Sequence, residues 1–153
     1  MPLKKLVEAD SSATFDKLFE KRDEIFIKHV EFITNLIKKQ GIVNLDLDDI
    51  KIMLENSGEG ITAFGKGEGQ DKVKLVIEQI INSPFIKNLP KARKILLSII
   101  VGADIGLTDL QEVTMILNEK FGADQINMLW GYIMDAELED KIEVEMLITD
   151  FSK

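Results

Sequence analysis

The segment Ile95-Leu96-Leu97-Ser98-Ile99-Ile100-Val101 forms a nearly continuous apolar run in a chain of 153 residues. Its β-branched residues favour an extended backbone, and the absence of polar alternation is typical of a strand buried on both faces. A strand of this kind lies inside a sheet that is covered by other elements. The segment therefore predicts a β-sheet with helices packed against it.

The segments on either side of this strand, predicted over 92–101, alternate between helical and extended patterns. Apolar residues recur at three- and four-residue steps, as in amphipathic helices, over 12–40, 46–56, 71–82 and 108–121. Further strands are expected over 60–65, 125–134 and 140–151. The predicted fold class is α+β, with a long N-terminal helix that leads into a roughly four-stranded mixed sheet on which helices pack.

The composition argues against several classes of function. With 27 acidic and 19 basic residues the net charge is -8, and nucleic-acid binding needs a basic surface. There is no cysteine, and the single histidine, His29, is expected to be a buried, hydrogen-bonded residue of the first helix. We expect no metal site, no nucleic-acid partner and no insertion into a membrane. A cytoplasmic location is expected, since no signal-peptide pattern is present.

A glycine-rich segment over 65–69 precedes a predicted helix, where a phosphate-binding loop would lie. It lacks the Gly-Lys-Ser/Thr ending of such a loop, and the carboxylate of Glu68 would repel a phosphate group. We therefore predict that 65–69 is a flexible turn between a strand and a helix.

The turn between the first two predicted helices carries the most distinctive polar residues. Gly41 is expected to end the first helix, and Asp46 to begin the second. Asp46 and Asp49 are three residues apart, so their carboxylates face the same way and could orient a water molecule. The same pair suits a structural role, with Asp46 as the N-cap and Asp49 completing a capping box. The spacing alone leaves both interpretations open.

Six motifs, in order along the chain, resemble those of FtsZ, the tubulin-like GTPase of bacterial and archaeal cell division. The stretch from Ala9 to Asp23 resembles the start of the FtsZ central helix. The stretch from Gly41 to Ile50 resembles its synergy loop, N-x-D-F-A-D-V, with Leu47 and Asp48 in place of the usual Phe and Ala. The other matches are the glycine-rich turn at 65–72, Ser-Pro-Phe at 83–85 (family Ser-Pro-Leu), Gly-Ala-Asp-Ile-Gly-Leu at 102–107 (family G-G-x-D-L-x-L) and Trp-Gly-Tyr-Ile-Met-Asp at 130–135 (family F-G-x-x-x-D).

The resemblance implies two parts, a central connecting helix with its lead-in over 1–40 and an FtsZ-like C-terminal domain over 41–153. It also implies roles for single residues. Asn44, Asp46 and Asp49 match the loop that reaches the GTP of the adjacent subunit, and they are the expected catalytic residues. Phe19 and Asp23 match the residues that stack on guanine and bond to its edge, and they are the expected cofactor-binding residues.

The sequence contains no counterpart of the FtsZ nucleotide-binding domain. We therefore expect a fragment or a truncated relative that does not hydrolyse GTP alone, with GTP bound mainly by the missing domain. The expected partners are other FtsZ-like subunits, head to tail, and an FtsZ nucleotide-binding domain at the division site. The expected function is to mediate protofilament contact and to supply the acidic synergy loop. The alternative is a non-catalytic, truncated FtsZ-like module that caps or regulates filaments.

Overall fold

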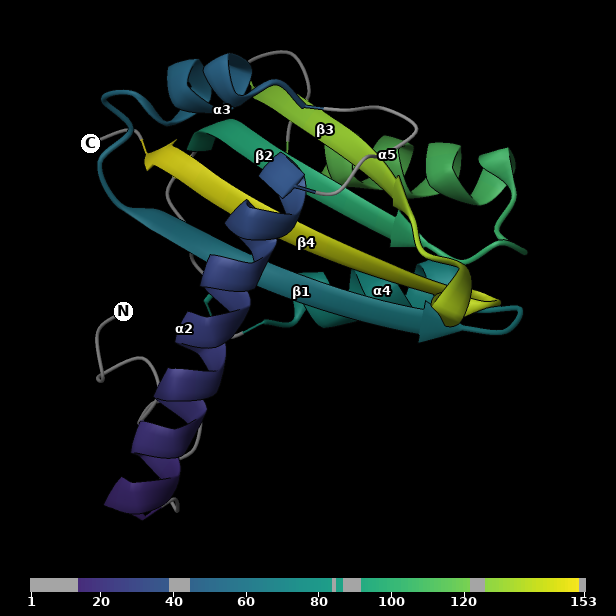
Figure 1. Ribbon diagram of the computed structural model, residues 1–153, viewed down its shortest axis with the longest axis horizontal. Helices are drawn as coiled ribbons and strands as arrows, with labels where there is room; N and C mark the ends of the chain where they lie inside the picture. Colours follow the sequence, from purple (N-terminus) through teal and green to yellow (C-terminus); the bar gives the residue numbers. More distant parts are fainter. Residues whose placement is uncertain (1–13, 39–44, 84, 87–91, 122–125, 152–153) are drawn as a thin grey trace.

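The computed structural model describes residues 14–38, 45–83, 85–86, 92–121 and 126–151 (Figure 1). Its elements are, in order, helix α2 (Phe15–Lys38), helix α3 (Leu47–Leu54), strand β1 (Gly60–Glu68), helix α4 (Lys72–Ile81), strand β2 (Ala92–Val101), helix α5 (Leu107–Phe121), strand β3 (Asn127–Met134), 3-10 helix η2 (Ala136–Leu138) and strand β4 (Lys141–Phe151). The predicted succession of helices and strands is confirmed, as is the α+β class.

The four strands form one mixed sheet in the order β1-β4-β2-β3. Strand β4 runs antiparallel to both β1 and β2, and β2 runs parallel to β3. The apolar run of β2 lies inside the sheet, and Ile95, Leu96 and Leu97 are fully buried. Because successive residues of a strand face opposite sides, this confirms that β2 is covered on both faces.

Two separate cores cover the two faces of the sheet. The larger core lies under α4 and α5 and includes Val76, Val113 and Val144. The smaller core holds Phe32 and Leu36 of α2 together with Ile50 of α3 and Leu96 of β2. Figure 1 shows α2 crossing the sheet with its C-terminal half and running off the sheet with its N-terminal half.

The predicted turn over 65–69 is wrong, because β1 continues to Glu68. A Cβ atom at Gly67 would lie 2.1 Å from the carbonyl oxygen of Lys72, and one at Gly65 would lie 2.6 Å from that of Val76. Both glycines therefore allow α4 to pack directly on the backbone of β1. The turn itself is shorter, and Gly69 takes a positive φ of 74° there.

Lys72 joins three elements at the end of the sheet where α4 begins. Its Nζ atom lies 2.6 Å from Asp140 Oδ1 and 3.8 Å from Asp109 Oδ2. The hydrogen bond from Lys72 lowers the pKa of Asp140 below its ordinary 3.8, and the same bond raises the pKa of Lys72 above 10.5. The pair therefore makes its full contribution to the stability of the fold between the two ordinary pKa values, 3.8 and 10.5. Its contribution is lost as the pH falls through the pKa of Asp140 or rises through that of Lys72.

We predict that Asp140→Asn destabilises the protein at pH 7 and that this difference shrinks towards pH 3. Urea unfolding of the wild type and the variant at both pH values measures it. Glu112→Gln, at an exposed position of α5, is the matched control and should change little at either pH. An equal destabilisation by Asp140→Asn at pH 7 and at pH 3 would show that the ion pair is not its cause.

Candidate functional site

Asp46 is the N-cap of α3. Its backbone is extended, and its Oδ1 accepts a hydrogen bond of 3.2 Å from the N–H of Asp48. Its carbonyl oxygen accepts the first helical bond, at 3.1 Å, from the N–H of Ile50. The predicted capping role of Asp46 is therefore confirmed. Asn44 lies outside the described residues.

Asp49 lies in the first turn of α3 and is exposed. The neighbouring Asp48 pairs with Lys51 at 3.2 Å. Within the described residues, the Asp49 carboxylate makes no hydrogen bond or ion pair, so the reciprocal bond of a capping box is not formed there. Ile50 and Met53 anchor the helix, each only 3% exposed. The result is a carboxylate that faces solvent from a helix whose other side is fixed in the core.

Phe19 and Asp23 lie in the N-terminal half of α2. The side chain of Phe19 is 41% exposed, and the guanidinium carbon of Arg22 lies 4.8 Å from the centre of its ring. Arg22 also donates two hydrogen bonds to Asp23 Oδ1, at 2.7 Å from Nη2 and 2.9 Å from Nε. An aromatic face and a carboxylate are thus presented side by side, held by one arginine.

The structure does not bring the two predicted sets of residues together. Helix α2 has 24 residues and is about 36 Å long. Figure 1 shows α3 over one edge of the sheet and the N-terminal half of α2 extending beyond the opposite edge. Phe19 and Asp23 therefore cannot share one site with Asp46 and Asp49 of the same chain.

The expectation that His29 is a buried, hydrogen-bonded residue is correct in one part and wrong in the other. Its Nδ1 meets the carbonyl oxygen of Ile25, and its Nε2 bonds with the hydroxyl of Thr62 on β1. The side chain is hydrogen-bonded as predicted, but it is half-buried rather than buried. Because the carbonyl oxygen of Ile25 can only accept, Nδ1 donates to it, and in the neutral ring Nε2 accepts the hydrogen bond from the Thr62 hydroxyl. The role of His29 is to join α2 to the sheet.

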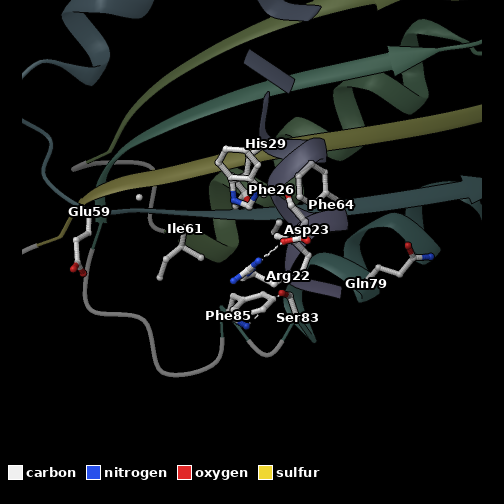
Figure 2. A pocket seen from close by; sticks show the side chains of 14 residues that line it. Arg22, Asp23, Phe26, His29, Glu59, Ile61, Phe64, Gln79, Ser83 and Phe85 are labelled. Atoms are coloured by element: carbon white, nitrogen blue, oxygen red, sulfur yellow. Dashed lines mark hydrogen bonds and ion pairs between the residues drawn. The ribbon is translucent and has the colours of Figure 1, made fainter. Parts of the chain in front are cut away.

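A cleft of about 970 Å³ lies between α2, β1 and the end of α4 (Figure 2). Arg22, Asp23 and Phe26 of α2 line one side, and Ser83 and Phe85 line another. The sequence did not predict this cleft, because the cleft joins segments that are about 60 residues apart. The lining residues Asp23 and Phe26 are three positions apart, which places them on one face of α2.

Two kinds of feature are absent from the described residues. No group of three or more His, Cys, Asp or Glu side chains among them is placed to hold a metal ion. None of the helices in the described ranges is both long and apolar enough to cross a membrane.

Comparison with known proteins gives consistent matches. The model of the FtsZ family, C-terminal domain, matches residues 58–152. Cell division protein FtsZ 1 of Thermococcus kodakarensis is 28% identical over 153 residues, which are 99% of this chain and 40% of that protein. An empty FtsZ dimer of M. jannaschii superposes with a TM-score of 0.80 at 25% identity, over 97% of this chain and 43% of that one.

A more distant structure shares the fold alone. A GTPγS-form protofilament of TubZ from Bacillus thuringiensis matches with a TM-score of 0.70 at 11% identity, over 99% of this chain and 40% of that one. The chain thus spans less than half the length of each of these proteins. Since the family model covers most of the chain and the same fold recurs over nearly all of it, the chain belongs to the FtsZ family, and it corresponds to the C-terminal part of its members.

Proposed function

We propose that this chain acts as the C-terminal domain of a cell-division filament protein, and that it supplies the acidic loop that activates GTP hydrolysis in the adjacent subunit. One observation carries the proposal. The Asp49 carboxylate is exposed and lacks a partner within the described residues, on a helix anchored by Ile50 and Met53. A carboxylate held in this way costs little reorganisation when it meets a substrate from outside.

The chemical role of Asp49 is to orient water. A carboxylate accepts a hydrogen bond from the attacking water and can hold it in line with the γ-phosphate of a bound GTP. Asp46 fixes the start of the helix that carries Asp49. Because α3 and the N-terminal half of α2 lie at opposite ends of the domain, the GTP in question belongs to a neighbouring subunit. This arrangement requires subunits stacked head to tail, and such filaments would assemble at the division site.

The N-terminal half of α2 is the proposed contact with a nucleotide-binding domain. Phe19 could stack on guanine, and Asp23 could accept hydrogen bonds from its edge if Arg22 moved aside. Further along the helix, Ile27 is 55% exposed and Val30 is 51% exposed. Several exposed apolar side chains on one helix indicate a surface that packs against another domain.

We predict that the 153-residue chain alone binds GTP only weakly and does not hydrolyse it. Phe19 and Asp23 can touch a base, but no segment of the sequence has the pattern of a loop that binds the phosphates. Isothermal titration calorimetry with GTP and magnesium, and a phosphate-release assay, measure the two quantities. Micromolar affinity or measurable turnover by a pure sample would contradict the proposal.

The alternative function is a non-catalytic module that caps filament ends. It is favoured by the apolar side chains beside the acidic turn, since Leu47 is 43% exposed and Ile52 is 67% exposed. These residues provide a docking surface that needs no chemistry from Asp49. Two substitutions distinguish the catalytic function from the capping function. Ile52→Asp should abolish filament contact in both, whereas Asp49→Ala should matter only for hydrolysis.

A further inference from the structure

Strand β1 is an edge of the sheet, and one side of its backbone is open. It pairs with β4 from Gly60 to Glu68 without interruption, and among the strands that the structure describes no other lies beside it. In an antiparallel ladder, the N–H and C=O of one residue point to the partner strand, and those of the next residue point away from it. Half of the backbone groups of β1 therefore face the open side.

The hydrogen bonds of the Gln79 side chain show which residues of β1 direct their backbone groups to the open side. Its Oε1 accepts a hydrogen bond of 3.0 Å from the N–H of Lys66, and its Nε2 donates one of 2.8 Å to the carbonyl oxygen of Lys66. The backbone of Lys66 thus points away from β4. Because the register is unbroken, the backbone groups of Phe64 and Thr62 point the same way. Within the described residues, nothing bonds to these outward groups.

The open side of β1 forms the base of the cleft described above. Figure 2 shows Phe26 and Arg22 of α2 beside β1, with Phe85 and Ser83 on the side away from His29. The cleft volume of about 970 Å³ is at the upper end of the range for bound ligands. The carboxamide of Gln79 already occupies the place of a partner's peptide group at one end, so this edge accepts an amide in strand geometry.

We propose that this cleft binds an extended segment of a partner protein, which adds to β1 as a further strand of the sheet. Main-chain bonds to Thr62 and Phe64 would hold the segment, and its alternate side chains would fit between Phe26 and Phe85. The bonds between Gln79 and Lys66 end the pairing site. The proposal rests on the cleft alone and does not depend on the proposed role in GTP hydrolysis.

The charges around the cleft define the chemistry of the segment. Arg22 and Asp23 neutralise each other at 2.7 Å. Glu59, at the start of β1, is exposed and has no ion pair within the described residues, whereas Lys28 lies 5.7 Å from the centre of the Phe64 ring at the other end. The chain as a whole carries a net charge of -8. We therefore expect a basic residue at the Glu59 end of the segment and none at the Lys28 end.

Backbone amide exchange in the full chain tests the proposal with a synthetic probe, acetyl-Thr-Val-Thr-Val-Lys-amide. Bound antiparallel to β1, its lysine meets Glu59. At saturating peptide, the exchange of the Thr62 and Phe64 amides should slow about tenfold or more. The amides of Ile61 and Ala63, which already face β4, should not change. Gln79→Ala should extend the protection to the Lys66 amide when a longer peptide is used.

Three controls test separately the backbone bonds, the charge and the apolar contacts of the bound peptide. N-methylation of the peptide residues that face β1 should abolish protection, whereas N-methylation of the alternate residues should not. Glutamate in place of the peptide's lysine should weaken binding. Phe26→Asp should weaken it by about tenfold, while Ile27→Asp, an exposed position on the same helix that does not line the cleft, should change it by less than about twofold.

Other results would overturn the proposal. If the probe leaves the Thr62 and Phe64 amides unprotected, or if both N-methylated peptides act alike, no strand is added at this edge. If the two amides are already protected in the free chain, a segment of the chain itself fills the cleft. If that protection increases with protein concentration, the occupant is a second copy of the chain rather than a partner.

Discussion

Replacing Asp49 with alanine, in a longer protein that carries a nucleotide-binding domain, is expected to lower filament-stimulated GTP hydrolysis by about 10²-fold or more. The affinity for GTP should stay unchanged. Asp49 would act only on the water of a neighbour's GTP, so its loss removes stabilisation of the transition state and not of the bound ground state. Phosphate release above the assembly concentration measures the first quantity, and calorimetry measures the second.

Two neighbouring acids provide matched controls. Asp48→Ala removes a carboxylate that pairs with Lys51 on the same helix turn, and it should leave hydrolysis near the wild-type rate. Asp46→Ala removes the N-cap of α3 and should lower stability by about 1 kcal/mol. Mixing Asp49→Ala with the wild-type protein should restore part of the activity, since each site is shared by two chains. Wild-type turnover by Asp49→Ala would mean that the catalytic assignment is wrong.

Replacing Gly67 with alanine is expected to lower the free energy of unfolding by about 3 kcal/mol. The added Cβ would lie 2.1 Å from the carbonyl oxygen and 2.7 Å from the carbonyl carbon of Lys72. These are backbone atoms of α4, so no side chain can turn away to make room. The helix would have to move off β1, and part of the larger core would open with it. Urea unfolding followed by circular dichroism measures the change.

Gly106→Ala is the control for this substitution. A Cβ at Gly106 would have Asp109 Oδ2 as its nearest neighbour, at 3.9 Å, which is an ordinary contact. The free energy of unfolding should therefore change by no more than about 0.5 kcal/mol. Similar destabilisation by both substitutions would show that the cost arises from the loss of glycine itself, and that the close approach of α4 to β1 is not its cause.

Much of the candidate site could be located from the sequence, because its signals are local. The cap at Asp46 depends on residues no more than four positions away, and the structure places it as predicted. The sequence could not decide whether Asp49 also serves as a capping partner. That depends on where its carboxylate points once α3 is anchored on the smaller core. The function of Asp49 itself stays a prediction.

The sequence by itself determined the helices and strands, their order and the burial of β2, because periodicity and composition act over a few residues. The tertiary structure alone decided the strand order, the bond between His29 and Thr62 and the cleft beside β1. It also turned the expected glycine loop into a strand, since Gly67 is set by its contact with Lys72. These features join residues that are distant along the chain, and no local pattern records which distant segments will meet.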